Sequence, residues 1–214
     1  MKNFLLTLPD WIYKKKCYFC RSSKESVKMC SKCYDKLVFN SKNANRIILG
    51  ADVYACGLYE NVMQKLIRAV KYHGQKDLAY FQAKFMWEYW QMLGIKDKFT
   101  VIPVPLSKKR QKDRKYNHME LVANEFCKLS GFASDFNLIK RVKNTKPQYK
   151  LKRIERMENL KNAFEVNLEF LPEDKILLID DICTTGSTFE SIILELNKNK
   201  VYNITCLATA TVDF

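Results

Sequence analysis

Residues 176–188 combine groups that could bind a phosphorylated sugar. Ile176–Ile179 is an uninterrupted apolar stretch, which predicts a buried strand, and Asp180 and Asp181 follow it directly. The residues that lead from there into a predicted helix over about 188–197 are Thr184, Thr185, Gly186, Ser187 and Thr188. Backbone N–H groups at a helix start can surround a phosphate together with small hydroxyls, and a glycine lets the phosphate approach the backbone. Adjacent carboxylates suit the vicinal hydroxyls of a ribose and can help to hold Mg²⁺ near a diphosphate.

The alternative interpretation of this run is a strand end followed by an ordinary Thr/Ser helix cap. A cap alone requires neither two adjacent carboxylates nor two threonines before a glycine. The pattern therefore favours a ribose-phosphate site at the carboxyl end of a strand, where open α/β sheets bind their ligands. Cys183 lies inside the run, so we expect its side chain to be partly exposed.

Four of the eight cysteines form two pairs with two residues between the members, Cys17 with Cys20 and Cys30 with Cys33. Each pair can turn both thiolates toward one point, and the nine intervening residues allow a reversal that brings four sulfurs to tetrahedral corners. Four cysteine ligands leave no open position, which favours a structural zinc ion. The redox alternative requires one CxxC after a strand in a thioredoxin-like unit, and that context is missing.

The size and composition bound the class of protein. The 214 residues suffice for one domain with a small appendage, and the contents of 47% apolar and 28% charged residues exclude a largely disordered chain. No apolar run approaches the length of a membrane span, and the apolar residues 4–8 are too few for a signal-peptide core. We therefore expect a cytoplasmic protein without a membrane span.

The net charge of +14 is unevenly distributed along the chain. Residues 1–50 carry +8 and residues 105–164 carry +10, whereas residues 165–214 carry −6. Two basic blocks indicate a polyanionic partner, because Lys and Arg supply most of the sequence-independent affinity for nucleic acid. A generally basic proteome or simple solubility would explain the same charge, and the charge alone leaves both explanations open.

The order of apolar patterns predicts the fold class. Strand patterns at 52–59, 99–104, 163–166, 176–179 and 201–212 alternate with helical patterns, among them one that ends at Gly94 and one capped by Asn117. Such alternation favours an α/β fold with parallel strands and helices on the faces of the sheet. A polar stretch at 41–45 separates the cysteine cluster from these elements.

Residues 176–188 resemble the signature of type I phosphoribosyltransferases, with apolar residues, two acids and then TTGST. From Cys17 to about Thr209 the chain also resembles the ComF family of competence proteins. Members of that family join a four-cysteine zinc module to a phosphoribosyltransferase-like domain. The resemblance implies a parallel-rich α/β sheet flanked by helices over 46–214, and a zinc module over 1–45.

The resemblance also implies a ligand, phosphoribosyl pyrophosphate with Mg²⁺, and residues that contact it. Asp180 and Asp181 would hold the ribose hydroxyls as the catalytic pair, and Thr184 to Thr188 would hold the 5′-phosphate. Residues 102–106 followed by Arg110 and Arg114 resemble the pyrophosphate-side loop, and residues 141–164 resemble a mobile flap. Independently of the resemblance, Lys71 precedes a tight turn at Gly74 and could reach a phosphate.

The chain departs from the family in the pyrophosphate-side loop. It has Arg114-Lys115-Tyr116-Asn117-His118 where the family usually has Arg-Gly-Phe-Asn-Gln. The lost glycine removes easy access to positive φ and adds a charge, so we expect a differently shaped loop. His118 could donate to a pyrophosphate oxygen, but a histidine in a first helical turn is more often a surface residue.

Candidate nucleic-acid contacts are lysines in the two basic blocks: Lys14, Lys15, Lys16, Lys108, Lys109, Lys112 and Lys115. Tyr13, Tyr18, Phe19 and Tyr34 are interspersed with cations of the zinc module, an arrangement that suits stacking on single-stranded bases. The same aromatics could instead fill the small core of the module, and we favour this second role for at least half of them.

Three functions remain open. The first is a competence protein that handles single-stranded DNA in the cytoplasm, in contact with the DNA-uptake machinery, and binds phosphoribosyl pyrophosphate with Mg²⁺. The second is an active phosphoribosyltransferase, although no segment that would recognise a nucleobase is evident. The third is a regulator that senses the ligand without turnover. We favour the first, because it uses the zinc module, the basic blocks and the ribose-phosphate loop together.

Overall fold

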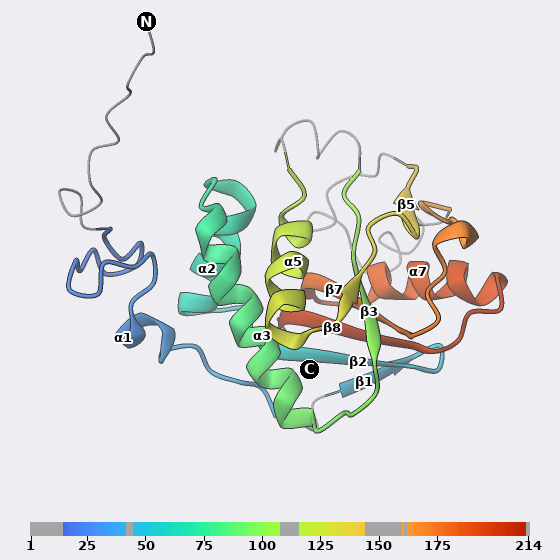
Figure 1. Ribbon diagram of the computed structural model, residues 1–214, viewed down its shortest axis with the longest axis horizontal. Helices are drawn as coiled ribbons and strands as arrows, with labels where there is room; N and C mark the ends of the chain where they lie inside the picture. Colours follow the sequence, from blue (N-terminus) through green and yellow to red (C-terminus); the bar gives the residue numbers. More distant parts are fainter. Residues whose placement is uncertain (1–14, 42–44, 108–115, 144–159, 161, 213–214) are drawn as a thin grey trace, which may run out of the picture.

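The computed structural model describes residues 15–41, 45–107, 116–143, 160 and 162–212 (Figure 1). Its main sheet has the strand order β1-β2-β8-β7-β3-β4. The strands are β1 (Asn45–Ile48), β2 (Ala51–Leu58), β8 (Ile204–Thr211), β7 (Lys175–Cys183), β3 (Phe99–Pro103) and β4 (Ala133–Ser134). All neighbours from β2 to β4 are parallel, and β1 joins β2 at the edge in the antiparallel sense. The five parallel strands therefore end at one edge of the sheet.

Helices cover both faces of this sheet. They are α2 (Asn61–Tyr72), α3 (Ala79–Leu93), α5 (His118–Ser130) and α7 (Ser187–Lys198), and a short helix η1 (Lys76–Leu78) connects α2 to α3. Residues of β7 alternate between the two apolar cores: Leu177 and Ile179 pack with α2, α3 and α5, whereas Ile176 and Leu178 pack with α7. This period of two is what a strand buried on both faces requires.

Two shorter elements lie outside the main sheet. Strands β5 (Ile139–Arg141) and β6 (Phe164–Val166) pair in the antiparallel sense, and a short helix η3 (Leu168–Phe170) follows them. A bond from the Val142 N–H to the Ala163 carbonyl at 2.9 Å continues this pairing. The two ends of the predicted flap are thus side by side, while its residues 144–159 lie outside the described part of the chain.

The predicted class is confirmed: a mostly parallel α/β sheet is flanked by helices, with a four-cysteine cluster near the N-terminus. The expected helix boundaries also agree, because Gly94 ends α3 at φ 70° and the side chain of Asn117 accepts the Met119 N–H at 3.0 Å. The clearest differences are at two strand boundaries. Strand β8 begins at Ile204 and not at residue 201. Strand β7 continues through Asp180 and Asp181 to Cys183, since it stays paired with β8 as far as Thr211.

In the part of the chain that the structure describes, no helix combines the length and the apolar character needed to cross a membrane.

Candidate functional site

The carboxyl end of β7 carries two adjacent carboxylates with different surroundings. Because side chains alternate along a strand, Asp180 and Asp181 point to opposite faces of the sheet. Asp181 is 5% exposed, and Asp180 is half-buried. The Asp181 N–H donates to Oδ1 of Asp180 at 2.8 Å, which fixes the orientation of the Asp180 carboxylate.

Two residues from different helices converge on one oxygen of Asp181. The Lys71 ammonium, from the last turn of α2, forms an ion pair with Oδ2. His118 Nε2, from the first turn of α5, lies 2.8 Å from the same Oδ2. A carboxylate oxygen can only accept, so Nε2 of His118 carries the proton. The side chains of His118 and Asp181 are 2% and 7% exposed, so this three-residue cluster is largely removed from water.

The two carboxyl groups differ in pKa because of these contacts. Burial alone would raise the pKa of Asp181, but the Lys71 ammonium and the hydrogen bond from His118 outweigh burial and hold it well below its ordinary value. Burial and the neighbouring Asp181 charge raise the pKa of Asp180 to about 7, against smaller opposing effects of Lys71 and Arg141. Asp181 is therefore a fixed anion, whereas Asp180 carries a charge that its surroundings oppose.

The loop after β7 presents backbone and hydroxyl groups at the start of α7. Gly186 precedes that helix with φ 79°, a conformation that favours glycine. The hydroxyls of Thr185 and Ser187 lie 2.5 Å apart, and the guanidinium of Arg46 donates from Nη1 to the Thr184 carbonyl at 3.1 Å. The half-buried Thr188 lies in the first turn of α7. Such a helix start can accept an anion.

Three features of the site differ from expectation or were missed. His118 is buried, so its interpretation as a surface residue is wrong; its sequence position cannot show that Asp181 of a distant strand lies opposite. Cys183 is 3% exposed rather than partly exposed, because it still belongs to β7. The role of Arg46 was missed, since only the antiparallel pairing of β1 with β2 brings it to the loop.

The remaining predicted contacts are dispersed or not described. Lys15 and Lys16 are exposed beside the cysteine cluster. Outside the described residues lie Lys14, Lys108, Lys109, Arg110, Lys112, Arg114 and Lys115. Their predicted roles toward nucleic acid and pyrophosphate stay predictions.

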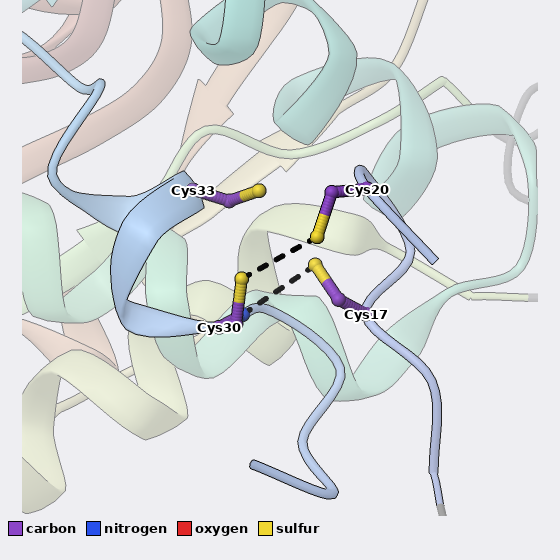
Figure 2. Close-up of side chains that lie close together, drawn as sticks. All are labelled: Cys17, Cys20, Cys30 and Cys33. Carbon is purple, nitrogen blue, oxygen red and sulfur yellow. Dashed lines mark hydrogen bonds between the residues drawn. The ribbon is translucent and has the colours of Figure 1, made fainter. Parts of the chain in front are cut away.

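The four cysteines of the two CxxC pairs lie close together (Figure 2). Their sulfur atoms are all within 4.8 Å of one another, and Sγ of Cys20 is 3.6 Å from Sγ of Cys30. Tetrahedral zinc bound by four thiolates requires sulfur separations of about 3.8 Å. Hydrogen bonds from backbone N–H groups outweigh burial and lower the pKa of Cys17 to about 6. The geometry and the donor set fit a structural zinc ion.

The cysteine module packs against α2 and α3. Cys17, Met29, Cys30 and Cys33 belong to the same apolar core as these helices. Polar contacts reinforce the packing: the Tyr18 hydroxyl lies 2.7 Å from Nδ1 of His73, and the Tyr34 hydroxyl donates to Glu88 at 2.7 Å. The half-buried Tyr18, Phe19 and Tyr34 also pack on this core, in agreement with the core role favoured above. The division into domains at residues 45 and 46 stays a prediction.

Replacing a zinc ligand should therefore affect more than the module. We predict one zinc ion per chain in the wild type, and loss of that ion in Cys30→Ser. The melting temperature should fall by on the order of 10 °C, because metal binding contributes folding free energy and the module shares its core with α2 and α3. Elemental analysis and thermal unfolding measure the two effects. Cys127→Ser is the control, and equal zinc content and melting temperature in all three proteins would contradict the prediction.

Replacing Asp180 or Asp181 by asparagine should change the free energy of unfolding in opposite directions. The raised pKa of Asp180 means that its stabilising contribution is complete below its ordinary pKa of 3.8 and is lost as the pH rises through about 7. Asp180→Asn keeps an acceptor for the Asp181 N–H and removes the opposed charge. It should therefore stabilise the protein by about 2 kcal/mol at pH 8, with the gain vanishing toward pH 4.

Asp181→Asn is the matched comparison in the same urea unfolding series. It leaves Lys71 and His118 without their carboxylate, so it should cost roughly 3 kcal/mol at pH 8. Equal destabilisation by both amide substitutions would show that the two acids do not have different surroundings.

Comparison with known proteins finds relatives that are named for competence and DNA utilization. Competence protein F of Haemophilus influenzae is 29% identical over 203 residues, covering 88% of this chain and 86% of that protein. Competence protein ComFC of Bacillus subtilis is 26% identical over 202 residues, covering 87% and 78%. DNA utilization protein YhgH of Salmonella typhimurium is 28% identical over 145 residues, covering 66% and 63%.

No protein-family model matches the chain. A solved structure of the allosteric regulatory enzyme of purine biosynthesis aligns with a TM-score of 0.37 and 14% identity, covering 70% of this chain and 26% of that one. The similarity to the two competence proteins extends over most of each chain, and it supports the ComF family to which the sequence motifs pointed.

Proposed function

We propose that this protein handles single-stranded DNA in the cytoplasm during natural transformation and binds phosphoribosyl pyrophosphate with Mg²⁺ at the carboxyl end of β7. One observation supports the ligand assignment most strongly. Asp180 and Asp181 at the end of β7 lead directly into the loop Thr184–Thr188, so that carboxylates, hydroxyls and a helix start lie in one segment. A ribose 5-phosphate needs acceptors for its hydroxyls and donors for its phosphate, and this segment offers both.

The two acids would contribute differently to the ligand site. Asp181 is engaged by Lys71 and His118, so it acts mainly by holding these groups in place. Asp180 is then the carboxylate that accepts from the ribose hydroxyls. Mg²⁺ usually combines one or two carboxylates with phosphate oxygens and water, so Asp180 and the diphosphate together suit it. Mg²⁺ would screen the charges of the diphosphate beside this acid.

The names of the relatives support the DNA-linked part of the proposal. Those proteins are called competence and DNA utilization proteins, and the basic cysteine module of this chain has exposed Lys15 and Lys16. Lysines supply sequence-independent affinity for phosphates. The same names support a role beside the DNA-uptake machinery.

A second candidate function is phosphoribosyl transfer, favoured by the uninterrupted ribose-phosphate segment. In such a reaction the enzyme stabilises the departing diphosphate through preorganised charges and Mg²⁺. Release of pyrophosphate that depends on an added acceptor distinguishes transfer from binding. Binding of phosphoribosyl pyrophosphate without such release, with any accompanying change in DNA affinity, indicates a regulatory use of the ligand.

The test of the proposal is a titration of zinc-loaded protein with single-stranded DNA, with and without Mg²⁺ and phosphoribosyl pyrophosphate. We expect the wild type to bind the DNA and to change its affinity when the ligand is present. The double variant Asp180→Ala, Asp181→Ala should keep the DNA binding and lose the response to the ligand. An absence of DNA binding at physiological salt would contradict the DNA role, and an unaltered ligand response in the double variant would contradict the site.

A further inference from the structure

The exposed face of α2 has a composition that folding does not explain. The helix buries Met63, Leu66, Ile67, Ala69 and Val70 against the core. Its outer face, at spacings of three and four residues, carries Gln64, Lys65, Arg68 and Tyr72. The helix contains three basic residues and no acidic one. The face therefore has no internal ion pairs of the kind that stabilise solvent-exposed helices.

Tyr72 stands on this face between two cations. It is 54% exposed, with Cζ of Arg68 6.0 Å and Nζ of Lys71 5.8 Å from the ring centroid. A single exposed aromatic residue is ordinary in a folded protein. A half-exposed ring flanked by two cations could also bind a nucleic acid, because the ring can stack on a base and the cations can contact phosphates.

Two more pairs of an aromatic ring and a cation lie at the last turn of α2. The guanidinium of Arg21 is 6.0 Å from the ring of Tyr18, whose hydroxyl contacts His73 at 2.7 Å. The ammonium of Lys76 is 4.8 Å from the ring of Tyr116. The hydroxyl of Tyr116 donates to the Val70 carbonyl at 2.6 Å.

These contacts bring the zinc module and the segment before α5 to the same end of α2. Figure 1 shows α2 between the module and α3. We call this set the α2 aromatic–cation surface, and its members are Tyr18, Arg21, Arg68, Tyr72, Lys76 and Tyr116.

The charge around this surface suits a polyanion. The described part of the zinc module, residues 15–41, contains seven basic and two acidic residues. By contrast, residues 165–214, which include α7, contain three basic and nine acidic residues. A polyanion would be attracted to the zinc module and α2 and repelled from the C-terminal segment.

We propose that the α2 aromatic–cation surface binds single-stranded nucleic acid, with Tyr72 stacking on a base and Arg68, Arg21 and Lys76 contacting phosphates. The inference rests on the proposed DNA role and centres it on Arg68, Tyr72 and Lys76, which lie outside both basic blocks. A single strand is favoured over a duplex because the bases of a duplex are already stacked on one another and leave only phosphates to contact. Lys71 joins this surface to the ligand site, since it lies beside Tyr72 and pairs with Asp181.

The experiment compares two double variants with the same loss of one cation and one exposed tyrosine. Arg68→Ala with Tyr72→Ala removes the centre of the surface. Lys198→Ala with Tyr202→Ala is the matched control at the acidic C-terminal segment, where Tyr202 is 65% exposed. Binding of an oligothymidylate to zinc-loaded protein is measured by fluorescence anisotropy at several salt concentrations, after melting temperature and zinc content have verified each fold.

We expect the first variant to bind at least about tenfold more weakly, and the control to stay within about twofold of the wild type. Tyr72→Phe should retain most of the affinity, because stacking needs the ring and not the hydroxyl. Affinity for a duplex of the same length should depend on Arg68 but not on Tyr72. Equal affinity of the two double variants for the single strand would overturn the inference.

A second measurement does not depend on the variants. Ultraviolet cross-linking of the wild type to a halogenated single strand should label the peptide that contains Tyr72 and not the one that contains Tyr202. Labelling of Tyr202 with no labelling of Tyr72 would contradict the inference that the α2 aromatic–cation surface binds the strand. If the wild type binds no single-stranded DNA, the proposed function fails; if it binds but neither measurement involves Tyr72, only the surface fails.

Discussion

Lys71 and His118 share a contact with one buried oxygen of Asp181. This contact ties α2, α5 and β7 together at the edge of the sheet where the parallel strands end. Removing one partner of such a cluster leaves a charge in a place with little water, which is costly. Around it, Tyr18 from the cysteine module contacts His73, and Tyr116 before α5 donates to the Val70 carbonyl. The last turn of α2 is thus fixed from three directions.

This arrangement assigns different tasks to two adjacent and chemically identical side chains. Asp181 is neutralised by its partners and serves the architecture, whereas Asp180 bears a charge that burial and Asp181 disfavour. Binding of a ligand or a cation would stabilise the charged form of a carboxylate in that position, because the bound group balances its charge. Sites that sacrifice stability in this way are commonly sites of function. The cysteine module contributes indirectly, since it packs on α2 and thereby supports the helix that carries Lys71.

Much of the fold and part of the site could be predicted from local patterns. The apolar stretch 176–179, the glycine after α3 and the Asn117 cap each act within a few residues, so the sequence reports them directly. Lys71 was a candidate from its place before a turn, but its partner Asp181 lies 110 residues away and is set by packing. The burial of His118 and the contact of Arg46 with the loop depend in the same way on tertiary structure. The end of β7 was placed too early because polar residues in a strand interrupt its apolar pattern, although the pairing with β8 continues.

We propose that the end of β7 and the loop after it form a site for phosphoribosyl pyrophosphate. The most direct test of this proposal is calorimetric titration of that ligand into zinc-loaded protein with Mg²⁺, for the wild type, Gly186→Ala and Gly131→Ala. Both glycines have positive φ, at 79° and 75°, so alanine strains both backbones. Only at Gly186 would the new Cβ meet a neighbour, Cδ1 of Ile48, beside the phosphate loop. We expect saturable binding of one ligand per chain in the wild type and in Gly131→Ala, and at least about tenfold weaker binding in Gly186→Ala. No binding by the wild type, or equal binding by both variants, would contradict it.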